Sequence, residues 1–226
     1  MPKPKRELSS EFPIHITARS NNREHFFISL PEVWEIFEDY LFLISKGFGI
    51  EIISFVLMPN HFHLLLRDPN LQLAQAMQYF MRETSREIAR KADRINRIWG
   101  GEFSSTVVKG TDYYFTCYKY IYRNPVKANL CKSVFDYPFS TLQGLLGERR
   151  SIIPLCEDLT LFDSLTATIQ WLDKPFEEDM DEVIRKSLKR KVMEFRVDRK
   201  SRRHFKAEMP PLPLTHLRYQ KEVPTF

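Results

Sequence analysis

The stretch FVLMPNHFHLLLR, residues 55–67, decides the fold, because it joins two apolar runs through a very short break. Residues 50–57, IEIISFVL, come before the break Met58-Pro59-Asn60, and residues 61–67, HFHLLLR, come after it. Apolar runs of this length on either side of turn residues predict two strands with a tight connection. Alternate residues of a strand face the same side, so His61 and His63 are expected to project together while Phe62 points into the core.

The segments around this strand pair predict an α+β protein. The expected elements are a strand in residues 13–20, a helix in residues 30–47, a second helix in residues 71–92, a short strand in residues 103–109 and a third helix in residues 111–130. Gly47 is expected to close the first helix, and Pro125 to break or bend the third. This order predicts a ferredoxin-like (RRM-like) antiparallel sheet with helices packed on one face.

The chain changes character after Arg150. Residues 176–195 predict a helix with an acidic front and a basic back, which complements the helix dipole. Residues 185–206 hold eleven Lys and Arg against two acidic residues, and residues 207–226 contain four prolines with little periodicity. We therefore expect a basic leader (1–12), a main domain (13–146), a helical basic extension (147–206) and a largely disordered tail (207–226).

Composition limits the functional classes. A formal charge of +5 alongside 43% apolar residues predicts a mildly basic globular protein with an anionic partner. The three cysteines form no CxxC pair, which argues against a disulfide scaffold or a thiolate metal site. No signal-type segment and no apolar run of membrane length occurs, so we expect a cytoplasmic protein without membrane contact.

The histidine pair is a candidate metal site. Neutral imidazole is a common ligand of divalent first-row metals, and a His-apolar-His triplet leaves room for a third ligand and substrate oxygens. The alternative is a polar face of an edge strand, which the triplet alone does not exclude. The strand from His61 to Leu66 is strongly apolar, and two imidazoles there would be costly unless they were bonded or ligated.

A second candidate pair lies in the third helix, where Tyr120 and Asn124 are four residues apart and share one face. A phenol can attack a phosphodiester and keep its energy in a phosphotyrosine, and a divalent ion would help the phenol to ionise. Two alternatives stay open, because a helical tyrosine is more often a packing residue and Asn124-Pro125 can start a short helix. Spacing alone does not choose among the competing tyrosines Tyr79, Tyr113, Tyr114, Tyr118 and Tyr122.

Four separated blocks together resemble a known family. They are IHITARSNNRE (14–24), FVLMPNHFHLLL (55–66), LAQAMQYFMRETSREIAR (73–90) and YKYIYRNPVKANL (118–130). Over roughly residues 13–146 the chain resembles the REP-associated tyrosine transposases, within the single-tyrosine HUH transposases of insertion sequences. Two departures from the family pattern are Ser20, where a glycine is usual, and GGEFSSTVV (100–108), where a basic and Phe-rich stretch is usual.

The resemblance implies a catalytic domain in residues 13–146 that binds Mg²⁺ or Mn²⁺ through His61, His63 and Asn124. It assigns Tyr120 as the nucleophile, since only this tyrosine fits the family pattern Tyr-x-x-x-Asn-Pro. The implied enzyme is a metal-dependent single-stranded DNA endonuclease and strand transferase that acts at palindromic repeats through a 5′-phosphotyrosine. We expect it to be nucleoid-associated and to act as a monomer or homodimer.

The expected partner is single-stranded DNA or a DNA hairpin. The residues expected to contact it are Arg19, Asn21, Asn22, Arg23, Lys109, Lys119, Arg123 and Lys127. Taken singly, a charged residue of this set is more often a solvated surface charge than a DNA contact, and the basic arm of residues 185–206 is a better candidate for phosphate contact. Two other functions compete with the transposase. One is a catalytically silent nucleic-acid-binding protein, and the other is another HUH nuclease, such as a replication initiator or a relaxase.

Overall fold

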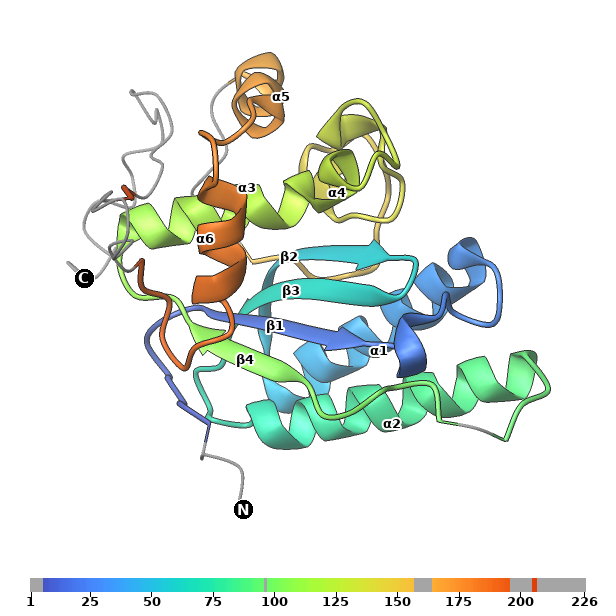
Figure 1. Cartoon of the computed structure of the whole chain (residues 1–226). Coiled ribbons are helices and arrows are strands. Elements are labelled where there is room, and N and C mark those ends of the chain that lie inside the picture. The colour runs from blue at the N-terminus through green and yellow to red at the C-terminus, as the bar shows by residue number, and fades with distance from the viewer. Residues whose placement is uncertain (1–5, 96, 157–163, 196–204, 207–226) are drawn as a thin grey trace.

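A four-stranded antiparallel sheet forms the centre of the protein (Figure 1). The computed structural model describes residues 6–95, 97–156, 164–195 and 205–206. The strands are β1 (Ile14–Arg19), β2 (Glu51–Met58), β3 (His61–Arg67) and β4 (Ser104–Val107), in the order β2-β3-β1-β4. Residues Pro59 and Asn60 alone connect β2 to β3, and Met58 pairs with His61 across the hairpin. The predicted ferredoxin-like α+β fold is confirmed.

Two long helices cover one face of the sheet, called here the α1/α2 face. Helices α1 (Leu30–Phe48) and α2 (Leu73–Lys91) pack against the side chains of Ile14, Ile16, Phe62 and Leu64. A capping box between Ser29 and Glu32 begins α1. Gly49, at φ +69°, ends α1, so the predicted closure at Gly47 is wrong. Gly49 supplies the left-handed conformation that a side chain would strain.

The third long helix, α3 (Thr111–Lys127), lies on the opposite side, called here the α3 face (Figure 1). The prediction of helices on one face only is therefore wrong. The reason lies in β2, which is buried on both of its faces over residues 52–58. Ile53 and Val56 belong to the core under α3, whereas Phe55 and Leu57 belong to the core under α1 and α2. A continuous apolar strand of this kind is typical of a sheet covered on both sides.

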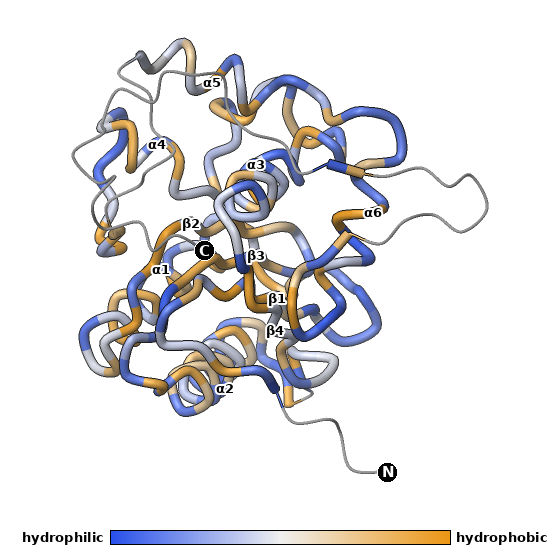
Figure 2. The backbone as a smooth tube through the Cα atoms, turned by 90° about the vertical axis from the view of Figure 1, so that its left-hand side faces the viewer, coloured by the Kyte–Doolittle hydropathy of each residue, from blue (hydrophilic) through white to orange (hydrophobic). Residues whose placement is uncertain are grey.

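Shorter elements extend the α3 layer. They are η2 (Val134–Asp136), α4 (Leu142–Leu145), α5 (Leu165–Asp173) and α6 (Met180–Ser187), whereas η1 (Asn21–Arg23) is part of the turn after β1. Trp171 and Ile184, from α5 and α6, join the core under α3. Helix α6 is shorter than the predicted helix of residues 176–195. The hydropathy colouring of Figure 2 shows the apolar strands enclosed between more polar helices.

Two segments of the C-terminal extension lie along the edges of the sheet. Leu155 forms a parallel bridge to Ile52 of β2, and Val192 forms one to Val107 of β4. The amide of Val107 donates to the carbonyl oxygen of Lys191 at 2.9 Å. The basic arm is described only over residues 185–195 and 205–206, and the proline-containing tail of residues 207–226 lies outside the described residues. Among the described helices, none has the length and hydropathy to cross a bilayer.

Candidate active site

The sheet register brings the histidines and the polar side chains of β1 together on the α3 face. In the antiparallel pair of β1 and β3, Arg19 lies opposite His61 and Thr17 lies opposite His63. Directly opposed residues point to the same side of a sheet, and so do residues two apart on one strand. Phe62 lies in the core of the other face, as predicted.

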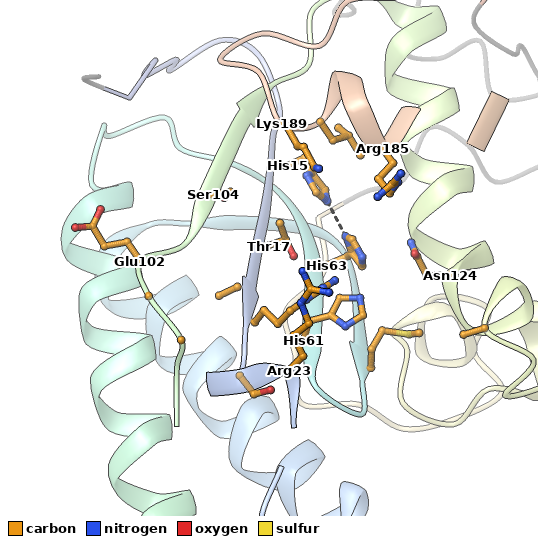
Figure 3. Close-up of a pocket in the computed structure, with 18 of the residues that line it drawn as sticks. His15, Thr17, Arg23, His61, His63, Glu102, Ser104, Asn124, Arg185 and Lys189 are labelled. Carbon is orange, nitrogen blue, oxygen red and sulfur yellow. Dashed lines mark hydrogen bonds between the residues drawn. The ribbon is translucent and has the colours of Figure 1, made fainter. Parts of the chain in front are cut away.

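A third histidine, which sequence reasoning missed, contacts the pair. Nε2 of His15 lies 2.9 Å from Nδ1 of His63, and both rings are buried (Figure 3). Nδ1 of His61 lies 2.7 Å from Oδ1 of Asn60. Each ring of the predicted pair thus has a hydrogen-bond partner at Nδ1. The alternation in IHITAR, residues 14–19, carried the signal for His15, since it places His15 on the same face as Thr17 and Arg19.

Helix α3 places Tyr120 beside the histidines. The ring centroids of Tyr120 and His63 are 5.8 Å apart, with the rings edge to face at 87°. Only 7% of Tyr120 is exposed, so it is also a packed residue, yet it lines the same pocket as His61 and His63. Proximity and access together make Tyr120 a candidate nucleophile.

Asn124 lies one turn after Tyr120 on α3, and both residues line the pocket. Its Nδ2 donates to the carbonyl oxygen of Tyr120 at 2.8 Å and approaches that of Ile121 at 3.4 Å. The helix continues through Pro125 to Lys127, so the predicted break and the alternative of a new helix at Asn124 are both wrong. Pro125 has no N–H to donate to Ile121, and the Asn124 amide offsets that loss. Oδ1 of Asn124 is left for a ligand.

A polar pocket of about 930 Å³ surrounds these groups. Its walls come from β1, η1, β3, the start of β4, the end of α3 and the end of α6. Of the predicted DNA contacts, the pocket is lined by Arg19, Asn21, Asn22, Arg23 and Lys127. Arg185 and Lys189, two residues of the predicted basic arm, also line it (Figure 3). The pocket therefore combines the candidate nucleophile with several cations, which suits an anionic substrate.

Three of the predicted DNA contacts lie elsewhere. Lys119 has no exposed surface, and its ammonium lies 5.4 Å and 5.1 Å from the ring centroids of Trp171 and Phe176. That burial contradicts its predicted role. Arg123 donates to the carbonyl oxygens of Leu172 and Asp173, so it fastens α5 to α3. Lys109 is exposed but stands outside the pocket.

The turn after β1 departs from the family pattern without strain. Ser20 has φ −59°, which any residue adopts, and its hydroxyl donates to the carbonyl oxygen of Glu24. The left-handed positions are instead Asn22 and Arg23, at φ 53° and 60°. Asparagine tolerates this conformation better than most residues. A glycine is therefore not required at position 20, and the turn still reaches the pocket.

Burial sets the protonation of the site. It lowers the pKa of His61 to about 4, with a smaller contribution from the charge of Arg19. It also lowers the pKa of His15 to about 3 and holds that of His63 well below its usual value. Burial raises the pKa of Tyr120 to about 12, and the charge of Asp181 adds to that shift. At neutral pH the imidazoles are therefore neutral, as ligands must be, and the phenol keeps its proton.

The candidate ligands fit a divalent ion, although they are too few to fill its coordination shell without water or substrate oxygens. Within the described residues, no three His, Cys, Asp or Glu side chains gather closely enough to hold a metal. The candidate ligands are Nε2 of His61, Nε2 of His63 and Oδ1 of Asn124, all neutral. Mg²⁺ and Mn²⁺ retain several oxygen ligands from water or phosphate when the protein supplies few. An open set of this kind suits an ion that must also bind substrate.

Comparison with known sequences identifies the family. The sequence model of the family "Transposase IS200 like" matches residues 9–124, which is just over half of the chain. The chain belongs to the IS200-like transposase family. The matched region begins before β1 and ends at Asn124, so it includes all four predicted catalytic residues. This transposase is a DNA-cleaving and DNA-joining enzyme by family, and no curated protein matches it.

Two solved structures are similar to this chain to different degrees. A REP-associated tyrosine transposase bound to a REP hairpin is 23% identical, with a TM-score of 0.54, over 72% of this chain and 96% of that one. A second structure, assigned to a transposase of Deinococcus radiodurans R1, is 17% identical, with a TM-score of 0.38, over 53% of this chain and 95% of that one. The first supports the same fold for this transposase.

Proposed function

We propose that this transposase is a metal-dependent, single-stranded DNA endonuclease and strand transferase in which Tyr120 is the nucleophile. The observation that carries the proposal is the contact between the rings of Tyr120 and His63, 5.8 Å apart, at the wall of a cation-lined pocket. A phenol beside two neutral imidazoles, each bonded at Nδ1, is an arrangement that suits metal-assisted attack by tyrosine.

The proposed chemistry is the one that the resemblance to the single-tyrosine HUH transposases implies. The oxygen of Tyr120 attacks phosphorus, the bond from phosphorus to the 3′-oxygen breaks, and a 5′-phosphotyrosine and a 3′-hydroxyl result. The phenol loses its proton and the leaving 3′-oxygen gains one, so the step is balanced and reversible. A 3′-hydroxyl that attacks the phosphotyrosine restores a phosphodiester and frees Tyr120, which joins two strands.

The metal ion has a defined task in this scheme. Held by His61, His63 and Asn124, Mg²⁺ or Mn²⁺ would polarise the scissile phosphate and favour the ionised phenol. Help of this kind is needed, because burial raises the pKa of Tyr120 to about 12 and leaves the phenol protonated at neutral pH. Arg19, Arg23 and Lys127 line the same pocket and would hold the phosphates that flank the scissile bond.

The proposed substrate is single-stranded DNA at a palindromic repeat. The structurally similar REP-associated transposase is described as bound to a REP hairpin, which supports a hairpin substrate here. A tyrosine on a buried helix reaches a phosphate only when the backbone is splayed into the pocket, which favours an unpaired strand. Tyr120 and His63 meet within one chain, so we expect a single copy to be active.

Covalent capture tests the proposal. The protein is incubated with Mn²⁺ and a labelled oligonucleotide that carries a hairpin and its single-stranded flank. We expect an adduct stable to denaturing electrophoresis, lost in Tyr120→Phe and retained in Tyr118→Phe. Tyr118 is the matched control, because it lies on the same helix and is buried but does not line the pocket. An adduct that persists in Tyr120→Phe would overturn the assignment.

A further inference from the structure

The contact between His15 and His63 has a consequence for the proposed metal site. The two rings are stacked, with centroids 5.2 Å apart and planes at 29°, and 1% and 7% of their surfaces are exposed. Their bond joins Nε2 of His15 to Nδ1 of His63 at 2.9 Å (Figure 3). This hydrogen bond contains one proton, which is covalently bound either to Nε2 of His15 or to Nδ1 of His63.

The nitrogen that carries this proton decides whether Nε2 of His63 can bind a metal ion. A neutral imidazole carries a single N–H. If Nδ1 of His63 holds the proton, it donates to His15, and Nε2 of His63 has a free lone pair. If Nε2 of His15 holds it, His63 must carry its own proton on Nε2, and that atom cannot be a ligand. Only the first arrangement fits the proposed site.

His61 also has a hydrogen-bond partner at Nδ1, and here the direction of the hydrogen bond is determined. Its Nδ1 meets Oδ1 of Asn60 at 2.7 Å, and the Asn60 amide is oriented by its Nδ2, which donates to the carbonyl oxygen of Arg23 at 2.7 Å. An amide oxygen can only accept, so Nδ1 of His61 donates and its Nε2 is unprotonated. Both rings of the pair thus have an Nδ1 partner behind them.

The burial of His15 is not explained by stability. Its Nδ1 is buried and has no hydrogen-bond partner among the described residues. A buried polar atom without a partner lowers stability, and an apolar side chain at this place would avoid the penalty. A group kept at such a cost beside a candidate ligand suggests a role in the site.

We propose that His15 is a positioning residue, which accepts the Nδ1 proton of His63 and so keeps Nε2 of His63 available to the metal ion. The inference rests on the proposed function, because it assumes that His63 is a ligand. Partners behind a ligating histidine fix its tautomer and orientation, and their loss weakens metal binding. Gln at position 15 can still accept through its side-chain oxygen, whereas Leu cannot.

The first test reads the tautomers without metal or DNA. Long-range ¹H–¹⁵N spectra of the metal-free, full-length protein, assigned with single-histidine variants, should show His63 protonated on Nδ1 and not on Nε2. His15→Leu should return His63 to a mixture that includes the Nε2-protonated form. A wild-type His63 protonated on Nε2 would overturn the proposal, whatever the catalytic result.

The second test measures Mn²⁺ binding by electron paramagnetic resonance. His15→Leu should weaken Mn²⁺ binding by about 10- to 100-fold, and His15→Gln should restore it to near the wild-type value. Ile16→Val is the matched control, since Ile16 is buried on the same strand but faces the α1/α2 core. Wild-type affinity in His15→Leu, confirmed as folded by its melting curve, would refute the role of His15. Failure of covalent capture with both tests positive would instead count against the proposed function.

Discussion

The two faces of the sheet use the same strands but are filled with different chemistry. On the α1/α2 face, Phe37 and Phe80 have ring centroids 5.1 Å apart, and Phe62 and Trp99 lie 5.6 Å apart. On the α3 face, Trp171 and Ile184 still pack under α3, but the part of this face that lines the pocket holds His15, His61 and His63. The α1/α2 face is a packed apolar core, whereas the α3 face combines apolar packing with buried imidazoles that lower stability.

Phe62 and His63 allow the two faces to be tested separately, because they are neighbours in sequence and point to opposite sides of the sheet. Phe62→Ala should lower the free energy of unfolding by about 3–5 kcal/mol, as expected for a buried aromatic truncated in a packed core. Urea unfolding followed by circular dichroism measures this loss. A loss below about 1 kcal/mol would mean that the α1/α2 core is not the source of stability.

His63→Ala should lower catalytic activity more than stability. We expect cleavage of the hairpin oligonucleotide to fall about 1,000-fold, equivalent to about 4 kcal/mol, because one ligand of the metal ion is lost. The free energy of unfolding should change less than in Phe62→Ala. Single-turnover cleavage with saturating Mn²⁺ measures the first effect, and near-normal cleavage would remove His63 from the catalytic site.

Acidification should act through the α3 face. Burial holds the folded-state pKa of His61 at about 4, below the ordinary value of 6.5. The unfolded chain therefore binds more protons, and stability that is full above pH 6.5 is lost progressively as the pH falls toward 4. His15 and His63 shift in the same direction.

Melting curves across this pH range measure the acid effect. His15→Leu should flatten the dependence, since it removes one buried imidazole, whereas Ile16→Val should leave the slope unchanged. An equal slope in wild type and His15→Leu would show that the pKa of His15 is the same in the folded and unfolded states.

The smallest effect is expected at the rim of the pocket. Arg185→Ala and Lys189→Ala should each weaken binding of single-stranded DNA by about 3- to 10-fold. Each should also make the slope of log binding constant against log salt concentration shallower by about 1, as expected for the loss of one phosphate contact. Lys109→Ala is the matched control, because Lys109 is exposed but does not line the pocket. Fluorescence anisotropy at several salt concentrations measures both quantities. Equal losses in all three variants would indicate a nonspecific effect of charge.

The sequence predicts the parts of the site that depend on local spacing. The period of a strand places His61 and His63 together, and the period of a helix places Tyr120 and Asn124 together. Choosing Tyr120 among its neighbours required the resemblance to a family, since the other tyrosines lie in the same helix and spacing alone does not separate them. The structure adds the contact with His63, which distinguishes Tyr120 physically.

The parts that could not be predicted depend on distant packing. Lys119 resembles a surface charge in sequence, but Trp171 and Phe176, some fifty residues later, cover it. The placement of α3 opposite α1 and α2 also follows from tertiary packing, although the apolar run of β2, interrupted only by Ser54, was a usable signal. His15 could have been found from the alternation in β1, whereas its bond to His63 depends on the register of β1 against β3.

The most direct test of the account is the identity of the residue that becomes bonded to DNA. Covalent complexes formed with Mn²⁺ and a hairpin oligonucleotide can be digested with protease and nuclease and then mapped by tandem mass spectrometry. We expect a nucleotide phosphate on Tyr120, attached through the 5′ end of the strand. A modification on Tyr118 or Tyr122, or cleavage that leaves no covalently modified tyrosine, would contradict it.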